Sequence, residues 1–301
     1  MLVVSKLIGG LGNQMFQYAA GRAVAKRMNC ALALDTHRLL DHSDTTITLR
    51  NYELRIFSGL AATIVDSRVA KTLVRYQTKP VFRAINKARK ILGLRPDYVE
   101  LGEGGTFHYN AMVAHYQAPA ALVYLDGYWQ NQRYFEAIAP QLRQELTFPA
   151  FAAGPNLEAS QRIAAAGSRA ISVHIRRGDY LQFADHGLCS VTYYEQALAL
   201  MMANVPDQQF FVFSDDLAWV KSNIPLPLGA IFIDWNQGVA SYHDLHLMSQ
   251  CRHHIIANSS FSWWGAWLNN HPNKLVISPR NWMGSPAVSA DRVVPESWHK
   301  L

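Results

Sequence analysis

Residues 170–180 read AISVHIRRGDY, an apolar run that changes abruptly into two arginines, a glycine and an aspartate. The first six residues, 170–175, have the length and apolar character of a strand that is buried on both faces. Such strands are typical of parallel sheets, which bind ligands in the loops beyond the carboxyl ends of the strands. The stretch therefore predicts an α/β domain whose chemistry begins at Arg176.

The alternation of strands and helices continues to the C-terminus. The further predicted strands are 210–213, 230–233, 254–257 and 274–277, and the predicted helices are 191–203, 217–222, 241–251 and 262–269. Five strands interleaved with helices predict a nucleotide-binding, Rossmann-like domain.

The N-terminal half follows the same pattern around a glycine-rich turn. A strand is predicted at 2–8, the turn GGLGN at 9–13, a helix at 14–28 and a second strand at 31–34. This β-α-β unit is typical of a parallel sheet.

The two halves are separated by a predicted linker. A further strand at 121–125 and a helix at 132–146 close the first half, and TFPAFAAGP at 147–155 carries two prolines and a glycine. We therefore expect an α/β protein with two Rossmann-like domains, 1–150 and 151–301, that face a cleft.

The composition of the 301 residues bounds the class of protein. Half of the residues are hydrophobic and 17% are charged, which is enough to bury a sizeable core. Three widely spaced cysteines argue against a disulfide framework or a zinc cluster and favour a reducing compartment. The apolar N-terminus is broken by Lys6 and is too short for a signal peptide. We expect a soluble, cytoplasmic protein.

The formal charge of +6 is concentrated in one segment. Residues 67–96 hold nine basic residues and no acidic one, which leaves the rest of the chain at −3. At helical spacing the basic residues would form one stripe, interrupted near Pro80. The simpler interpretation is a solvated helix face. The sharper hypothesis is peripheral binding to the anionic inner face of a membrane.

The loop Gly9–Gln14 is the first of four candidate ligand-binding loops. Glycines let the backbone approach a ligand closely, and the helix N-terminus that follows favours anions. The alternative is a tight turn with Asn13 as the helix N-cap. The candidate contacts are Gly10, Gly12, Asn13 and Gln14.

The second loop follows the strand 170–175 and adjoins His174. Arg176 and Arg177 offer planar forks of donors that suit phosphate. Asp179 would orient an arginine or accept a proton. The alternative for this loop is a surface salt bridge.

The third loop is Ser214-Asp215-Asp216. Paired carboxylates can hold a metal between phosphates, but adjacent ones at a helix start favour N-capping. We expect capping by Ser214 and Asp215 together with a hydrogen bond to a nucleotide, without a metal.

The fourth loop opens the helix 262–269 and offers hydroxyl and N–H donors for phosphate. Its candidate contacts are Asn258, Ser259, Ser260, Phe261 and Ser262, whereas Trp264 is expected in the core. Asp244, on the preceding helix, has a carboxylate suited to the N1 and N2 donors of guanine. On spacing alone an exposed helix residue is the simpler interpretation of Asp244.

Together these segments resemble the α-1,2-fucosyltransferases of glycosyltransferase family 11. The resemblance rests on GGLGNQMFQYAAG (9–21), LDGYWQNQRYF (125–135), VHIRRGDY (173–180), SDD (214–216) and MSQCRHHIIANSSFSWWGAWL (248–268). It covers nearly the whole chain, although 35–105 matches no motif and leaves acceptor choice open.

The resemblance implies a GT-B type enzyme that transfers L-fucose from GDP-fucose to the 2-hydroxyl of a terminal galactose, with inversion and without a metal or cofactor. In the C-terminal domain, Arg176 would hold the β-phosphate, with His174 and Arg177 beside it. Asp244 would contact guanine, and Ser259–Ser262 would contact the pyrophosphate.

The same resemblance places the acceptor on the N-terminal domain. The loop around Asn13 would face fucose and acceptor, with Asp126 and Trp129 on that side. Asp179 is the first candidate for the general base, followed by Asp126 and Asp185. The acceptor would be a bacterial-type surface glycan such as an O-antigen, either free or linked to a lipid.

Two alternative hypotheses about the function stay open, and a third is disfavoured. Within the enzyme class, the alternative is another fucose linkage or another GDP-sugar. A non-catalytic sugar-nucleotide-binding protein would have the same fold. A nucleic-acid-binding protein is disfavoured because the basic charge is local and no RRM, KH or helix-turn-helix pattern is present.

Overall fold

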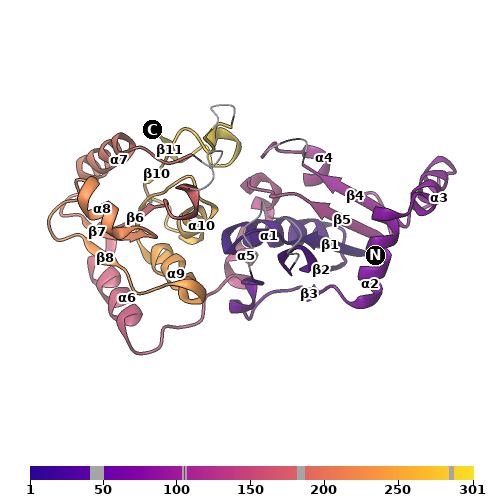
Figure 1. Cartoon of the computed structure of the whole chain (residues 1–301), viewed down its shortest axis with the longest axis horizontal. Coiled ribbons are helices and arrows are strands. Elements are labelled where there is room, and N and C mark those ends of the chain that lie inside the picture. Colours follow the sequence, from indigo (N-terminus) through magenta and orange to yellow (C-terminus); the bar gives the residue numbers. More distant parts are fainter. Residues whose placement is uncertain (41–50, 104, 106, 182–186, 285–287) are drawn as a thin grey trace. The chain divides into compact units, whose positions relative to one another are not determined.

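The computed structural model describes the chain except residues 41–50, 104, 106, 182–186 and 285–287. The chain divides into two compact units, Met1–Thr147 and Phe148–Leu301 (Figure 1). In the described part of the chain, no helix combines the length and apolar character needed to cross a membrane.

The first unit is built on a five-stranded parallel sheet. Its strands are β1 (Leu2–Lys6), β2 (Ala31–Asp35), β3 (Thr63–Ile64), β4 (Tyr98–Gly102) and β5 (Leu122–Asp126). Their spatial order is β3-β2-β1-β5-β4, and every neighbouring pair is parallel. The order reverses between β1 and β5, which makes the carboxyl ends of these two strands the switch point of the sheet.

The helices of the first unit are α1 (Leu11–Arg27), α2 (Ser67–Thr78), α3 (Pro80–Ile91), α4 (Ala111–Ala114) and α5 (Ala139–Glu145). Helix α1 is the central one: it packs on β1 and β2 and is buried over most of its surface. Its small and aromatic residues suit this position, because they allow close contact with the sheet.

The second unit is built on a six-stranded sheet that is also parallel. Its strands are β6 (Ala170–Ile175), β7 (Gln209–Ser214), β8 (Ile231–Ile233), β9 (His253–Ile255), β10 (Val276–Ser278) and β11 (His299–Lys300). The spatial order is β11-β10-β9-β6-β7-β8. This is the doubly wound Rossmann order, whose switch point lies between β6 and β9.

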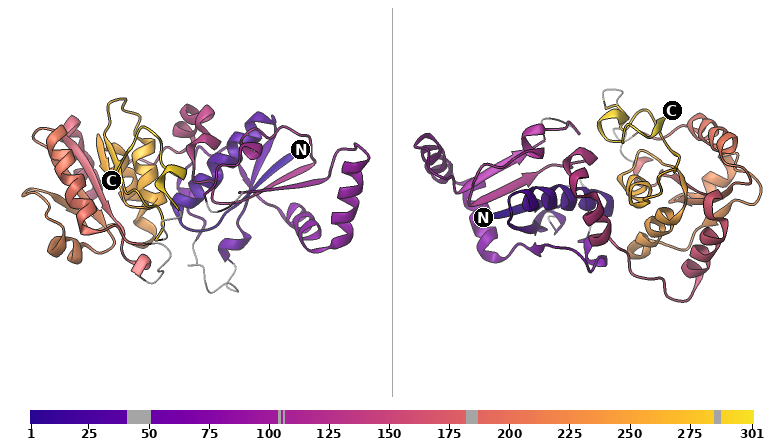
Figure 2. Two further views of the ribbon diagram at one scale, coloured as in Figure 1. Left: turned by 90° about the horizontal axis from the view of Figure 1, so that it is seen from above. Right: turned by 180° about the vertical axis from the view of Figure 1, so that it is seen from behind.

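Helices cover both faces of this second sheet (Figure 2). They are α6 (Pro155–Ala166), α7 (Val191–Asn204), α8 (Leu217–Asn223), α9 (Tyr242–Gln250) and α10 (Ser260–Leu268). On β7, Phe210 and Val212 join the core cluster with α7 and α8, whereas Phe211 and Phe213 join the cluster with α6 and α9. This two-residue alternation is why the strand is apolar throughout.

The predicted class, an α/β protein with two Rossmann-like domains, is confirmed. One predicted helix, 132–146, is wrong. Two short 3₁₀ turns, Gln132–Tyr134 and Glu136–Ile138, precede α5, in whose first turn Pro140 lies. Proline lacks the N–H that a continuous helix needs at this point, so the helix begins here rather than running through. Strands β3, β4 and β11 and helix α6 had no sequence prediction.

Candidate functional site

The carboxyl ends of β6 and β9 meet at the switch point of the second sheet. Arg176 follows β6, and the segment 256–259 follows β9. The hydroxyl of Tyr180 donates to the backbone carbonyl of Asn258 at 3.2 Å, which ties the two loops together. The position predicted for chemistry at Arg176 therefore coincides with the place where such sheets bind ligands.

Arg176 is held by a carboxylate from the neighbouring strand. Its Nη1 lies 3.0 Å from Oδ2 of Asp215, and each side chain is 26% exposed. The backbone N–H of Arg177 donates to the other oxygen of Asp215 at 2.9 Å. A Cβ at Gly178 would lie 2.6 Å from Asp215 Oδ2, so a larger residue there would displace the carboxylate from its place beside Arg176. The guanidinium is fixed in place and still accessible to a ligand.

The predicted helix cap in this loop belongs to a different residue. Asp216, not Asp215, is the N-cap of α8 and accepts from the N–H of Trp219 at 3.1 Å. Ser214 accepts from the N–H of Asp216 at 3.0 Å. The correction follows from where the helix starts: Asp216 directly precedes Leu217, and this position aligns its carboxylate with the first helical N–H groups. Asp215 is thereby left to pair with Arg176.

The side chain of Arg177 contacts other residues of the protein. Its Nε lies 3.2 Å from Oδ2 of Asp216, and its guanidinium lies 3.6 Å from the ring centroid of Trp219. Stacking and ion pairing hold the side chain in one geometry. Of the two adjacent arginines, Arg176 is the more exposed, at 26% of its side chain against 15% for Arg177.

His174 lies beneath the arginines at the end of β6. It is 5% exposed, and its Nδ1 has no hydrogen-bond partner among the described residues. Burial, reinforced by the positive charge of Arg176, lowers the pKa of His174 to about 4, with Asp215 acting in the opposite direction. The imidazole is therefore neutral at physiological pH. Its ring lies 5.9 Å from that of Phe261.

The start of α10 supplies the other side of the switch point. Ser259 is the N-cap and accepts from the N–H of Phe261 at 3.3 Å, and Ser262 donates to the carbonyl of Ser259 at 3.4 Å. The N–H groups of the first helical turn, which includes Ser260, carry the partial positive charge of the helix end. The first turn contains no acidic residue, so an anion is not repelled there.

Asn258 holds this loop in shape. Its side-chain amide donates to the carbonyls of Gly187 and Trp282, both at 3.2 Å. Its Oδ1 accepts from the thiol of Cys189 at 3.5 Å. Because both the NH₂ group and the oxygen of its side-chain amide are bonded within the protein, the role of Asn258 is to stabilise the conformation of the loop.

Asp244 lies in the first turn of α9. Its carboxylate accepts a hydrogen bond from the side-chain amide of Asn236 at 2.7 Å. Burial raises its pKa to about 7, although the bond from Asn236 acts against this. Helix α9 follows β8 and leads back to β9, so its first turn lies at the same edge of the sheet as Arg176. The interpretation of Asp244 as an exposed helix residue is wrong.

The switch point of the first unit contains the glycine-rich turn. Gly9 has φ +76°, a backbone conformation suited to glycine, and a Cβ there would lie 2.5 Å from Asn13 Nδ2. The N-cap of α1 is Gly10, without a side-chain bond, so the alternative of Asn13 as N-cap is wrong. The N–H of Leu11 is satisfied instead by Oε2 of Glu53, at 3.0 Å.

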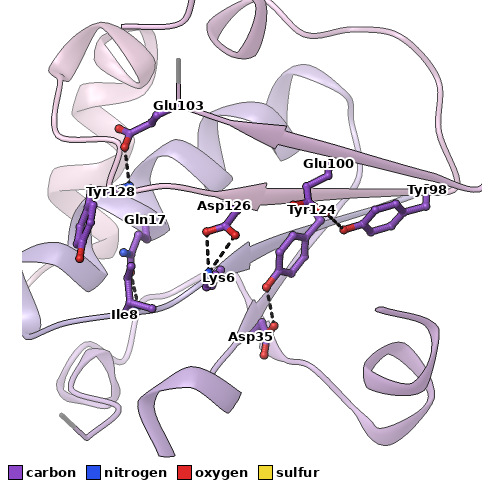
Figure 3. A network of polar contacts seen from close by, with 10 residues as sticks. All are labelled: Lys6, Ile8, Gln17, Asp35, Tyr98, Glu100, Glu103, Tyr124, Asp126 and Tyr128. Carbon is purple, nitrogen blue, oxygen red and sulfur yellow. Dashed lines mark hydrogen bonds and ion pairs between the residues drawn. The ribbon is translucent and has the colours of Figure 1, made fainter. Parts of the chain in front are cut away.

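Two polar contacts join β1 and α1 to the residues that follow β5. Asn13 Oδ1 accepts from the amide of Gln130 at 2.9 Å. Lys6 forms an ion pair with Asp126 at 2.8 Å, and the two residues end β1 and β5 (Figure 3). Gln14 is fully buried and bonds to the carbonyls of Gly9 and Asn51. Gly12, also buried, lies in the first turn of α1.

Glu103 is a residue of this site that the sequence did not reveal. Its carboxylate accepts from the backbone N–H of Tyr128 at 3.0 Å (Figure 3). It also accepts from the backbone N–H of Trp129 at 2.6 Å. Trp129 is fully buried and has φ +57°, which is strained for a bulky residue. Burial raises the pKa of Glu103. The acid lies outside every motif, so no sequence signal pointed to it.

Some predicted residues fall outside what the structure describes. The backbone of Asp179 begins a 3₁₀ turn, but its side chain is not described, and Asp185 lies outside the described residues. Among the described residues, no group of three or more His, Cys, Asp or Glu is arranged to hold a metal ion.

The fold and these two switch points define an α/β protein with two Rossmann-like domains. The pattern of glycosyl transferase family 11 matches residues 107–301, and the chain belongs to this family. The protein is therefore a glycosyltransferase.

Two bacterial relatives match along the whole chain. An alpha-1,2-colitosyltransferase of Escherichia coli is 30% identical over 100% of this chain and 99% of its own. The O-antigen biosynthesis glycosyltransferase WbnK of Escherichia coli is 29% identical over 99% of each chain. Galactoside 2-alpha-L-fucosyltransferase Sec1 of Mus musculus is 30% identical over 50% of this chain and 43% of its own.

Solved fucosyltransferase structures share the fold. The fucosyltransferase NodZ from Bradyrhizobium has a TM-score of 0.53 and 14% identity, over 96% of each chain. A mutant of Arabidopsis thaliana FUT1 in complex with GDP has a TM-score of 0.52 and 14% identity, over 98% of this chain and 72% of its own. The GT-B type of fold implied by the sequence resemblance agrees with these similarities.

Proposed function

We propose that the protein transfers L-fucose from GDP-fucose to the 2-hydroxyl of a terminal galactose, with inversion and without a metal, in the synthesis of a bacterial surface glycan such as an O-antigen. The observation that carries the proposal is the accessible, carboxylate-held Arg176 at the switch point of the second sheet. Relatives named for α-1,2 transfer support the linkage, and the relative named for O-antigen biosynthesis supports the class of glycan.

The charges at this site suit the departure of a nucleotide diphosphate. Breaking the bond to the sugar leaves negative charge on the β-phosphate, which needs fixed positive partners in the transition state. Arg176 and the start of α10 at Ser259 supply them without a metal. Because both are held before a ligand arrives, little reorganisation is needed during the reaction.

Guanine recognition is assigned to Asp244. A carboxylate can accept from both the N1–H and the N2–H of guanine, and the ionised form does this best. The bond from Asn236 holds the carboxylate in one orientation. His174, neutral and buried behind Arg176, supports the site by packing and keeps an imidazole nitrogen available for a hydrogen bond.

The acceptor is assigned to the first unit, at the turn around Asn13 and the end of β5. Asp179 is the first candidate for the base that takes the proton from the acceptor hydroxyl, with Asp126 and Asp185 as alternatives. Asp126 is already paired with Lys6. Three single Asp→Asn variants separate them: the base is the one whose loss lowers kcat without weakening GDP binding.

A second donor is favoured by one specific comparison. One of the two bacterial relatives that match along the whole chain is named for transfer of colitose, which is the 3-deoxy counterpart of fucose. The alternative function is therefore transfer of colitose, or of another GDP-linked sugar, by the same site. Competition between GDP-fucose and GDP-colitose for one acceptor measures the preference as a ratio of kcat/KM values.

Incubation with GDP-fucose and a panel of galactose-ended glycans, followed by linkage analysis of the product, tests the proposed function. A 2-linked fucosyl-galactose product is expected. Another linkage would correct the acceptor position. Tight GDP-fucose binding without turnover on any acceptor would favour a non-catalytic sugar-nucleotide-binding protein instead.

The proposed partners of the reaction include the carrier of the acceptor. We infer a lipid-linked glycan at the cytoplasmic face of a membrane, and a peripheral contact of the basic segment 67–96 with that surface. The support is chemical: the segment holds nine basic residues and no acidic one.

A further inference from the structure

Helix α3 is held against the first unit by one of its faces. Asn86 is buried, and its amide donates to the carbonyl of Tyr98 at 2.5 Å. Its Oδ1 accepts from the N–H groups of Asp97 at 2.9 Å and of Tyr98 at 3.2 Å. Phe82, one turn earlier, packs edge-on against Tyr76 of α2. These contacts fix which sides of α3 face away from the protein.

A second face of α3 is apolar and exposed. Val81 is 58% exposed, Ile85 48% and Leu92, directly after the helix, 72%. Their spacing of four and seven residues places them on one stripe of the helix. Ile91 at 76% and Leu94 at 52% extend the apolar surface at the same end. Several large aliphatic side chains gathered on one short helix are unusual for a surface that stays in water.

The third face of α3 is basic. Arg83, Lys87 and Lys90 follow one another at intervals of four and three residues, so they form a stripe of their own. All three side chains are exposed, and no ion pair with an acidic residue is found for them in the described part of the chain. At 100° per residue the basic stripe lies nearly opposite Val81, Ile85 and Leu92, and Ile91 lies between the two stripes on the side that faces away from Asn86.

We propose that α3, together with residues 92–94, is the surface that docks this protein on an anionic lipid bilayer. The outward side of α3 carries the exposed Ile91, with aliphatic side chains on one edge and the unpaired basic stripe on the other, which matches the boundary between acyl chains and anionic headgroups. The helix has twelve residues, which suits a position in the plane of the interface. Helix α3 lies at an end of the first unit (Figures 1 and 2), and most of its residues are exposed.

Two other occupants fit the surface less well. A second copy of this segment has no acidic residue to offer the basic stripe, so its charges would stay unpaired in such an interface. A single-stranded nucleic acid would use the basic stripe but not the aliphatic one, since bases stack on aromatic rings. Docking to lipid uses both stripes and rests on the membrane contact proposed above, for which it names the surface. Vesicle binding is measured without donor or acceptor, so its failure would leave the proposed transfer reaction untouched.

Co-sedimentation of the full chain with vesicles tests the proposal. We expect binding to vesicles of phosphatidylcholine mixed with phosphatidylglycerol, and weak binding to phosphatidylcholine alone. Each basic side chain near an anionic surface strengthens binding by about fivefold, so Arg83→Glu with Lys87→Glu should weaken it by at least about tenfold. Ile85→Ser with Leu92→Ser should weaken it comparably.

Matched controls lie on the second unit. Arg162→Glu on α6 removes an exposed basic side chain, and Leu228→Ser removes a fully exposed apolar one. Both should bind vesicles like the unaltered chain, and thermal melting should show that all variants stay folded. Equal binding to both kinds of vesicle, or unchanged binding of either double variant, would overturn the proposal. So would a dimer in solution that the Ile85→Ser, Leu92→Ser variant abolishes.

Discussion

The carboxylate of Asp215, which follows β7, lies 3.0 Å from the guanidinium of Arg176, which follows the neighbouring strand β6. The same carboxylate accepts the backbone N–H of Arg177. Adjacent parallel strands thus place an acid and a base side by side at the edge where α/β sheets bind ligands. In the proposed reaction, the positive charge that a leaving diphosphate needs is thus oriented before the nucleotide binds.

Arg176→Ala should lower the rate of transfer by about 10²–10³, as expected for the loss of one preorganised charge-stabilising donor. Steady-state assays with GDP-fucose and a galactose-ended acceptor measure this. Arg169→Ala is the matched control, because Arg169 precedes β6 at the opposite end of the strand, where it donates to the carbonyl of Asp207. Activity near that of the unaltered chain for Arg176→Ala would contradict the proposed role.

Asp215→Asn should lower kcat by about tenfold while GDP binds equally well or more tightly. The neutral amide of this variant cannot hold Arg176 by an ion pair, but it also does not repel the phosphates of GDP. Asp216→Ala, at the neighbouring position, should instead cost about 1 kcal/mol of stability through loss of the α8 N-cap. Weaker GDP binding with unchanged kcat for Asp215→Asn would show that the acid contributes to binding rather than to positioning.

The affinity for GDP should rise about tenfold between about pH 6 and pH 8, because only the ionised form of Asp244 accepts both guanine donors. The pKa of Asp244 is raised from its ordinary 3.8 to about 7 by burial. His246 on the same helix has a pKa lowered to about 4, so it stays neutral in this range. Titration calorimetry at several pH values measures the effect.

Asp244→Asn is the control for this pH dependence. The phosphates of GDP also titrate near pH 6, and only the part of the slope that the variant removes belongs to Asp244. The pH dependence of the stability of the ligand-free chain has the opposite sign to that of the affinity for GDP. Since folding raises this pKa, the contribution of Asp244 to stability is present below about pH 4 and is lost as the pH rises towards 7. An unaltered slope in the variant would rule out Asp244 as the guanine contact.

Gly127→Ala should destabilise the first unit by about 1–3 kcal/mol, the usual range for overpacking. A Cβ at this position would lie 2.8 Å from Glu103 Cγ and 2.9 Å from the Trp129 ring. Gly102→Ala is the control: the nearest atom to its Cβ would be the Asp126 carbonyl oxygen, at 3.6 Å. Denaturant unfolding compares the two variants, and equal midpoints would mean that the turn relaxes around the added methyl.

The sequence predicted those parts of the fold and site whose cause is local. The run 170–175 matches β6 residue for residue, because Ala170, Ile171, Val173 and Ile175 give it the apolar character of a strand that is buried on both faces. Arg176 and Arg177 lie beyond the end of the strand for the same reason, since charged side chains do not suit a strand that is buried on both faces. Pro80 predicted the interruption between α2 and α3, since its ring fits only the first turn of a helix.

Features that depend on distant residues could not be predicted. Helix α1 begins at Leu11 rather than at 14, because Glu53, far along the chain, accepts its first N–H. Which aspartate caps α8 depended on where β7 ends, and the other aspartate then paired across the sheet. Glu103 supports Trp129 in a conformation that no local pattern encodes.

The boundary between Thr147 and Phe148 separates two units that each bury a core of their own. The family pattern covers all of the second unit but only the end of the first. The side chains of each of these core clusters come from one unit alone, so a change in one core is accommodated within its own unit. Such an architecture lets evolution remodel one module while inheriting the other intact.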